Sequence, residues 1–274
     1  MSKTILITGS STGIGRATAF KFQKEGWNVI ATMRTPEKET ELTQLDNVLV
    51  TRLDVQDLAS IDSAIRAGIE RFGKIDALLN NAGYGLMGTF ESASREAVKR
   101  QFDVNVFGLF DVTRALLPHL RSNRSGVIMN VSSVGGRITF PLISLYHSTK
   151  FAVEGMSESL HYELAPMGIQ VKLIEPGAIA TDFGSRSMDF QHDESLTDYN
   201  EFVGHVMGAF EGMMNPEMAS KPDLVADVIF AAATDGTSTL RYVAGPDAEQ
   251  FLAARNQMSD SEFIGMMKGN LGLA

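Results

Sequence analysis

Hydrophobic residues occur along the first two thirds of the chain in short continuous runs, and amphipathic stretches separate these runs. Residues 4–7 show the apolar character of a strand buried on both faces, whereas residues 16–24 show helical spacing. Strands that alternate with helices form a sheet covered by helices on both faces, so we expect an α/β fold. The pattern predicts strands at residues 4–7, 27–33, 48–53, 75–79, 126–132, 169–174 and 240–244, and helices at about 16–24, 58–71, 95–117, 146–165 and 222–234.

The composition and net charge exclude several classes of function. The net charge of −9 over 274 residues argues against a nucleic-acid partner, because phosphate binding needs a basic surface. The absence of cysteine excludes disulfides, thiolate nucleophiles and cysteine-ligated zinc, and the five histidines lack metal-ligand spacing. The amino-terminal residues lack a signal-peptide core, and no apolar run approaches the ~20 residues of a membrane span. We therefore expect a cytoplasmic protein with no metal and no membrane partner.

A glycine-rich turn, Thr8–Gly15, follows the first predicted strand and opens the first predicted helix. Glycines let the backbone approach a pyrophosphate, and the start of a helix presents free N–H groups to it. A tight strand–helix connection is the alternative interpretation. The position of the turn within a strand–helix–strand unit favours nucleotide binding. We therefore expect a doubly wound, Rossmann-type sheet of seven parallel strands in a single domain over residues 1–274.

The spacing of Gly9, Gly13 and Gly15 resembles the Thr-Gly-x-x-x-Gly-x-Gly turn of the short-chain dehydrogenase/reductase family. The resemblance extends over residues 4–181. It implies an enzyme that acts on CH–OH and C=O groups with NAD(P). Three segments are similar to the branch that resembles 17β-hydroxysteroid dehydrogenases, whose members act on varied hydrophobic ketones and alcohols: residues 80–88, 146–155 and 241–246.

Tyr146 and Lys150 are four residues apart, which places both on one face of a helix. A neighbouring ammonium group favours the phenolate and lowers the tyrosine pKa from its usual ~10, although the spacing also occurs by chance on solvated helices. The resemblance implies that Tyr146 is the general acid and base, and that Lys150 lowers its pKa and binds the nicotinamide ribose. It further implies that Ser133 polarises the carbonyl, with Ser132 as the runner-up, and that Asn105 holds a water of a proton relay.

The neighbour of the tyrosine, His147, points elsewhere on the helix and is interpreted as incidental. No catalytic function is assigned to it.

The resemblance also implies a set of cofactor contacts. Asp54 is expected to accept a hydrogen bond from the adenine amino group; a turn or capping carboxylate is the alternative, although Asp57 is better placed to cap the helix that begins near Leu58. The expected contact residues are Gly9, Ser11, Thr12, Gly13, Ile14, Gly15, Arg34, Asp54, Asn81, Ala82, Gly83, Tyr146, Lys150, Pro176, Gly177, Ile179 and Thr181.

The end of the second predicted strand bears on cofactor choice. An acidic residue there would bind the ribose 2′-hydroxyl of NAD and repel a 2′-phosphate. This chain has Met33 at that position and Arg34 next, and a guanidinium matches a phosphate well. The sequence predicts a preference for NADP(H), with NAD(H) as the second cofactor.

The character of the chain changes between residues 182 and 222. Residues 188–199 are polar and acidic without periodicity, which predicts a mobile segment. Apolar residues then recur at helical spacing, as in a helix packed on the core, and the resemblance implies that this region is the substrate lid. A wall rich in Met and Phe favours an apolar substrate. The residues of this stripe are Tyr199, Phe202, Val203, Val206, Met207, Phe210, Met213 and Met214.

Together these features predict an oxidoreductase that transfers a hydride between NADP(H) and a small hydrophobic ketone or secondary alcohol. A catalytically silent NADP-binding regulatory protein is the alternative, but such chains usually lose the Tyr or the Lys. Nucleotide-sugar epimerases and dehydratases share the chemistry, yet usually carry a larger C-terminal substrate domain. The resemblance also admits a homo-oligomer, either a dimer or a tetramer.

Overall fold

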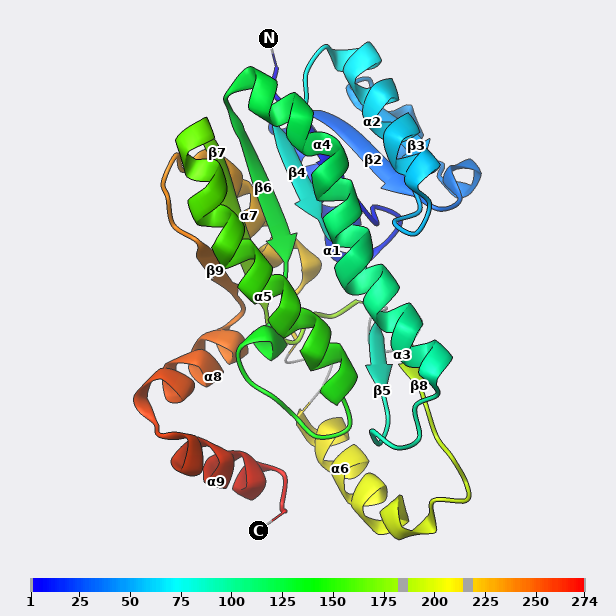
Figure 1. Cartoon of the computed structure of the whole chain (residues 1–274), viewed down its shortest axis with the longest axis vertical. Helices are drawn as coiled ribbons and strands as arrows, with labels where there is room; N and C mark the ends of the chain where they lie inside the picture. Colours follow the sequence, from blue (N-terminus) through cyan, green and yellow to red (C-terminus); the bar gives the residue numbers. More distant parts are fainter. Residues whose placement is uncertain (1, 182–186, 214–218, 274) are drawn as a thin grey trace.

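The computed structural model describes residues 2–181, 187–213 and 219–273. Seven parallel strands form one sheet in the order β3-β2-β1-β4-β6-β7-β9 (Figure 1), which confirms the predicted doubly wound, Rossmann-type α/β fold. The strands are β1 (Thr4–Ile7), β2 (Asn28–Met33), β3 (Val48–Arg52), β4 (Ala77–Asn80), β6 (Gly126–Val131), β7 (Ile169–Pro176) and β9 (Arg241–Ala244).

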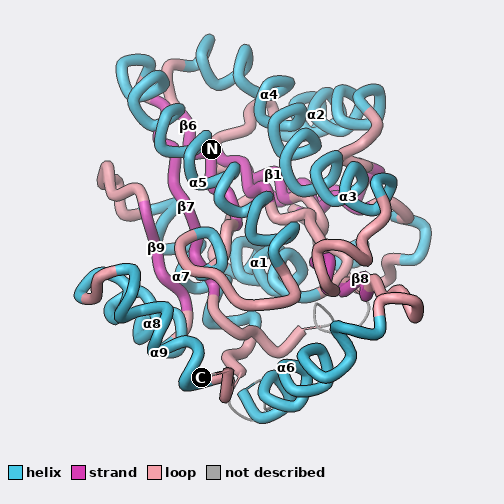
Figure 2. The backbone as a smooth tube through the Cα atoms, turned by 60° about the horizontal axis from the view of Figure 1, so that its bottom comes forward, coloured by secondary structure: helices cyan, strands magenta, loops and turns pink. Residues whose placement is uncertain are grey.

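Helices cover both faces of this sheet. Figure 2 shows α2 and α4 on one side of β1 and α1 on the other. The side chains of β1 explain its continuous apolar run, because Ile5 and Ile7 enter the core beneath α1 and α7 while Leu6 enters the core beneath α2 and α4. The covering helices are α1 (Gly13–Lys24), α2 (Leu58–Phe72), α4 (Leu109–Asn123), α5 (Ser144–Leu164) and α7 (Pro222–Thr234).

Strand order reverses between β1 and β4, whose neighbours β2 and β6 extend the sheet in opposite directions. Ligands of doubly wound sheets bind outside the carboxyl ends of the strands at such a switch point. The glycine-rich turn follows β1 and the Asn80–Gly83 segment begins at the end of β4, so both lie at this edge.

The helix predicted over residues 95–117 has a distortion. It consists of α3 (Arg95–Phe102), a π-helical turn (Asp103–Gly108) and α4. Turns of this kind occur within α-helices at functional sites. The turn contains Asn105.

The region beyond the carboxyl ends of the strands contains the helices α6 (Asn200–Met213), α8 (Pro246–Gln257) and α9 (Asp260–Asn270), at the lower end of Figure 1. The helix predicted from the apolar stripe is α6, and its buried Val206 and Phe210 pack with Leu142 and Leu271. Of the predicted stripe, Met214 lies outside the described residues, as do residues 182–186 and 215–218 of the predicted lid.

This region contains a strand that the sequence analysis did not predict. Residues 188–199 were expected to be mobile, which stays a prediction, and β8 (Met188–Phe190) pairs in parallel with β5 (Gly85–Met87) in a second, two-stranded sheet. A three-residue strand is too short to show a period of two, and its pairing partner lies about 100 residues earlier in the chain. Among the described residues, no helix has the length and apolar character needed to span a membrane.

Candidate active site

In the turn between β1 and α1, the backbone at Gly15 passes close to the backbone at Gly9. Gly9 and Gly13 have φ angles of +69° and +56°, which favour glycine. A Cβ on Gly15 would lie 2.4 Å from the Gly9 carbonyl oxygen, so that position admits no side chain without movement. No acidic side chain occupies the first turn of α1, so its positive dipole end stays uncompensated there. This arrangement fits a pyrophosphate.

The segment after β4 holds this turn through hydrogen bonds. The Thr8 hydroxyl accepts from the backbone N–H groups of Asn81 at 2.9 Å and Ala82 at 3.0 Å. The Asn81 amide donates to the carbonyl oxygens of Thr8 at 2.9 Å and Gly9 at 3.1 Å. The two predicted cofactor segments therefore form one rigid unit.

The first asparagine of that segment, Asn80, has a different function. Its buried amide donates to Asn130 Oδ1 at 2.8 Å and Thr113 Oγ1 at 2.9 Å. These bonds join β4 to β6 and α4, which steadies the centre of the sheet.

The third predicted cofactor segment, Pro176–Thr181, lies against the turn. A Cβ on Gly13 would lie 3.3 Å from Thr181 Cγ2. Asp247, which was not predicted, holds this segment by accepting from the Ala178 N–H at 2.7 Å. A Cβ on Gly177 would lie 2.2 Å from the Asp247 carboxylate, so the glycine makes room for it. The only signal in the sequence is the short Gly-Pro-Asp run after the last strand.

The residues predicted to select the cofactor lie at the ends of neighbouring strands. Met33 at the end of β2 pairs with Arg52 of β3, and the exposed Arg34 follows it. The partly buried Asp54 follows β3 and accepts from the Gln56 N–H at 3.1 Å, so it also shapes a turn. Asp57 accepts from the Ser60 N–H and caps α2, as predicted.

The structure brings the predicted catalytic side chains together where β6 ends and α5 begins. The Ser133 hydroxyl lies close enough to the Tyr146 phenol to lower its pKa, and it accepts from the Gly135 N–H at 3.0 Å. Lys150 Nζ lies 5.6 Å from the centroid of the Tyr146 ring and donates to the Val131 carbonyl at 2.8 Å. Ser133 therefore lies beside the tyrosine. The Ser132 hydroxyl is buried, and a Cβ on the nearby Gly136 would lie 2.6 Å from it.

Burial shifts the pKa values of both Tyr146 and Lys150. Burial raises the pKa of Tyr146 to about 12, although the Ser133 hydroxyl opposes this effect. Burial lowers the pKa of Lys150 to about 8, although the charge of Glu154 opposes it. The net pKa of Tyr146 is thus raised in this structure, and the expected lowering effect of Lys150, whose Nζ is bound to the Val131 carbonyl, stays a prediction. At pH 7 the phenol is protonated and most of the lysine is charged.

The π-helical turn directs Asn105 toward the catalytic helix. Its buried amide accepts from the Tyr84 N–H at 3.1 Å, and donates to the Tyr84 carbonyl at 2.9 Å and to Thr149 Oγ1 at 3.2 Å. Thr149 immediately precedes Lys150. Asn105 therefore joins the segment after β4 to α5, and its function in holding a water stays a prediction.

His147, interpreted as incidental, is buried and bonded through both ring nitrogens to the loop between β6 and α5. The side chain therefore connects α5 to this loop. The sequence carried no signal for these contacts, since both partners are backbone atoms.

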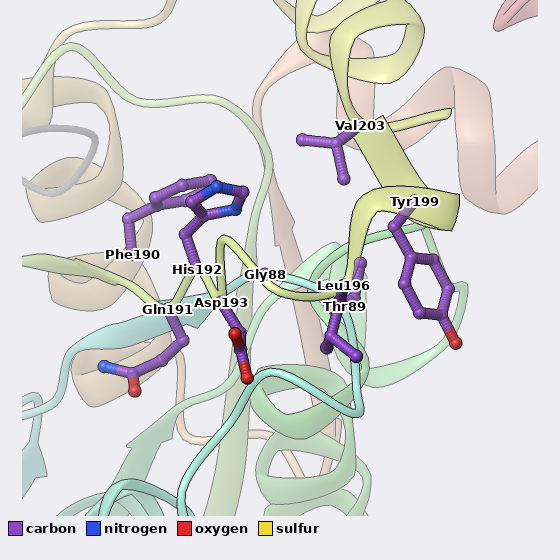
Figure 3. Close-up of a pocket in the computed structure, with 9 residues that line it drawn as sticks. All are labelled: Gly88, Thr89, Phe190, Gln191, His192, Asp193, Leu196, Tyr199 and Val203. Atoms are coloured by element: carbon purple, nitrogen blue, oxygen red, sulfur yellow. The ribbon is translucent and has the colours of Figure 1, made fainter. Parts of the chain in front are cut away.

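Two hollows lie near the predicted lid. Figure 3 shows the smaller one, formed by Gly88 and Thr89 together with side chains from Phe190 to Val203. Its volume of about 10 Å³ accommodates one water at most, so it is no substrate site. A groove of about 290 Å³ lies between residues 139–141 and α9, and its lining includes Phe140 and Met267.

The model of the family described as short chain dehydrogenase matches residues 3–192. The chain belongs to this family. An uncharacterized oxidoreductase of Schizosaccharomyces pombe is 40% identical over 243 residues, which are 88% of this chain and 100% of the relative. A 3-ketodihydrosphingosine reductase of Bacteroides thetaiotaomicron is 38% identical over 197 residues, 72% of this chain and 70% of the relative. The chain is thus an oxidoreductase of the kind that acts on CH–OH and C=O groups with NAD(P).

Solved structures agree with the fold and the cofactor class. A short-chain dehydrogenase from Streptomyces avermitilis superimposes with a TM-score of 0.83 at 34% identity, covering 100% of this chain and 98% of the other. ElxO with NADP bound gives 0.72 at 28% identity, covering 89% and 98%. A 3-ketoacyl-(acyl-carrier-protein) reductase from Brucella melitensis complexed with NADH gives 0.70 at 30% identity, covering 89% and 95%. The family fold thus accompanies either nicotinamide cofactor.

Proposed function

We propose that the protein transfers a hydride between NADP(H) and a hydrophobic ketone or secondary alcohol. The observation that carries this proposal is the contact among Ser133, Tyr146 and Lys150 at the same sheet edge as the glycine-rich turn. Proton donor, carbonyl-polarising hydroxyl and cofactor cradle are then close enough to act on one substrate.

The cradle at this edge fits a dinucleotide. The glycines of the turn and the start of α1 would hold the pyrophosphate, and Asp54 and Asn81–Gly83 would hold the adenosine. Pro176–Thr181 would contact the nicotinamide end and Lys150 the ribose. When bound, the nicotinamide supplies or takes the hydride.

The ionisation states support ketone reduction near neutral pH. Tyr146 is protonated there, so it can give its proton to the carbonyl oxygen as negative charge develops. The Ser133 hydroxyl polarises the same oxygen, and the charged Lys150 stabilises the phenolate that remains. In the oxidative direction Tyr146 has to lose its proton first, which its raised pKa opposes.

An apolar substrate is supported by the packing around the predicted lid. Val206 and Phe210 of α6 turn inward toward Met87 and Leu142. The relative named for 3-ketodihydrosphingosine reduction acts on a ketone of this kind. We propose that residues 182–222 are the substrate lid of one cytoplasmic domain spanning residues 1–274. The finer placement beside the 17β-hydroxysteroid dehydrogenases stays a prediction.

A homo-oligomer is supported by exposed aromatic side chains. Phe107 on the π-helical turn and Phe151 on α5 are 53% and 46% exposed, and these two elements contact each other. Sedimentation equilibrium tests this point, and a monomer at all concentrations would contradict it.

The experiment that tests the function measures NADPH consumption with a panel of aryl, alicyclic and long-chain ketones. Tyr146→Phe should lower kcat at least about 100-fold because the proton donor is lost. Turnover at the wild-type rate would show that Tyr146 is not the acid. NADPH binding without turnover of any ketone or alcohol would favour the silent regulatory protein.

Cofactor preference is tested by titrating NADPH and NADH. Arg34→Ala should weaken NADPH binding about tenfold or more, because a charge-assisted contact with the 2′-phosphate is lost, and should spare NADH. Lys38→Ala, at another exposed cation after β2, is the matched control. Equal efficiency of the wild type with both cofactors would contradict the preference.

A further inference from the structure

The side chain next to the catalytic tyrosine is tied to the loop that connects β6 to α5. His147 lies in the first turn of α5 with 2% of its surface exposed. Its Nδ1 lies 2.7 Å from the Gly135 carbonyl oxygen, and its Nε2 accepts from the Phe140 N–H at 2.9 Å. The imidazole thus joins two points of one loop, residues 134–143.

These two partners fix the tautomer. Because the Phe140 N–H can only donate, Nε2 has to be the unprotonated nitrogen, and Nδ1 carries the hydrogen donated to Gly135. The contact is tight, since a Cβ on Gly135 would lie 2.6 Å from Nδ1. Only a neutral imidazole satisfies both backbone groups.

The first contact leads to the catalytic pair. The N–H of Gly135 donates to Ser133 Oγ at 3.0 Å, and the Ser133 hydroxyl lies close enough to the Tyr146 phenol to influence its pKa. His147 therefore holds Gly135, whose N–H orients Ser133. His147 also follows Tyr146 directly in the chain. The four residues form a closed ring of contacts around the proposed reacting atoms.

The second contact leads to the proposed substrate region. The Phe140 ring stacks on His147 with centroids 6.0 Å apart. It also meets Phe210 of α6 at 6.4 Å and Phe251 of α8 at 5.6 Å, both edge-on. The same imidazole thus couples the catalytic pair to the helices that cover it.

We propose that His147 is a positioning residue: its neutral Nδ1–H form clamps loop 134–143 so that Ser133 faces Tyr146, and its protonation releases the loop. The inference rests on the proposed function for its catalytic consequence. A protonated imidazole has no acceptor for the Phe140 N–H, so acid breaks one side of the clamp.

The surroundings determine where this release occurs. The titratable groups of α5 nearest in sequence are Tyr146, Lys150 and the buried Glu154, which lies against Gly136, and Arg137 follows in the loop. Tyr146 stays neutral below about pH 12, Lys150 is bound to the Val131 carbonyl, and Arg137 donates to Glu175 at 3.2 Å. The helices α6 and α8 contact Phe140 through the apolar rings of Phe210 and Phe251. Burial lowers the pKa of His147, so the clamp opens below the usual histidine pKa of ~6.5.

The test compares two substitutions with a matched control. His147→Phe keeps the ring and its stacking but removes both bonds, whereas His147→Gln keeps one donor and one acceptor. His161→Phe changes another histidine of α5, whose Nδ1 faces the Val171 carbonyl at 3.2 Å. We expect His147→Phe to lower kcat for ketone reduction about 10- to 100-fold at pH 7 and to lose the acid limb of the pH profile. His147→Gln should recover part of kcat, and His161→Phe should leave it unchanged.

Two readouts need no turnover. Nitrogen NMR should show His147 as the neutral Nδ1–H tautomer at pH 7, and hydrogen exchange of the Phe140 amide should be slow in the wild type and fast in His147→Phe. An Nε2–H tautomer, unchanged Phe140 exchange in His147→Phe, or wild-type kcat with the acid limb intact would overturn the proposal. If wild-type protein reduces no ketone, the proposed function fails, and the NMR and exchange results still decide whether the clamp exists.

Discussion

The turn after β1 and the helix α6 both contain several glycines, but the space around those glycines differs. A Cβ on Gly15 would lie 2.4 Å from the Gly9 carbonyl oxygen, and one on Gly9 would lie 3.0 Å from Ala82 Cα. On α6, by contrast, no atom of the described residues outside the helix's own neighbouring backbone lies within 4 Å of the positions where Gly204 and Gly208 would carry a Cβ. Close backbone approach requires the first set, whereas the second set only weakens a helix.

The same difference appears in what holds each region. Hydrogen bonds from Asn81 to the carbonyl oxygens of Thr8 and Gly9 fix the turn, with a geometry set to a few tenths of an ångström. Apolar contacts of Val206 and Phe210 hold α6, and such contacts tolerate sliding and repacking. Rigid, hydrogen-bonded groups therefore form the edge proposed to bind the cofactor. Apolar groups that can repack form the region proposed to bind the substrate.

The largest effect is expected from filling the crowded position. In Gly15→Ala the new methyl meets the Gly9 carbonyl and the Asn81 amide, at 2.4 and 2.5 Å, so the turn or the Asn81 segment has to shift. Overpacking of this kind costs about 1–3 kcal/mol. NADPH affinity should fall at least about tenfold, as measured by fluorescence titration.

The matched control is Gly155→Ala on the exposed face of α5, where no atom lies within 4 Å. It should leave NADPH affinity unchanged. If Gly15→Ala also binds NADPH as the wild type does, the cofactor edge is less rigid than its hydrogen bonds indicate.

The difference between the glycine-rich turn and α6 also explains which features could be predicted from the sequence. The glycine turn and the Asn80–Gly83 segment are recognisable because only certain residue types allow their backbone geometry. The raised pKa of Tyr146 was missed because burial depends on the tertiary structure, and Nζ of Lys150 is held by a backbone carbonyl. Contacts of His147 with backbone atoms and the pairing of the three-residue β8 leave no residue pattern in the sequence.

A smaller effect, on the free energy of unfolding, is expected at the buried carboxylate of Glu175. Glu175 on β7 is fully buried; one oxygen accepts from Arg137 at 3.2 Å and lies 3.4 Å from Arg241 Nε. The other oxygen has no hydrogen-bond partner among the described residues. Burial and the charge of Glu154 raise the pKa of Glu175.

The sign of the resulting pH dependence follows from linkage. Above the unfolded pKa of ~4.3, the unfolded chain releases this proton while the folded protein retains it. The free energy of unfolding therefore falls as pH rises toward the folded pKa. Glu175→Gln removes this loss, so its stability relative to the wild type should be about 1–2 kcal/mol greater at pH 8 than at pH 5. Thermal unfolding at both pH values measures this, and a difference independent of pH would mean that Glu175 titrates normally.

The smallest effect is expected on α6, where glycines occupy open positions of a helix. Gly204→Ala and Gly208→Ala should each stabilise the helix by about 0.5–1 kcal/mol, because alanine loses less backbone entropy and its methyl meets no neighbour in the described part of the chain. Urea unfolding measures the gain, and NADPH affinity should not change since the cofactor edge is untouched. If the helix has to move for substrate to enter, the stabilised variants should also show a lower kcat for bulky ketones. Loss of stability in either variant would mean that another surface packs on α6, and the two regions would then differ less than their glycines indicate.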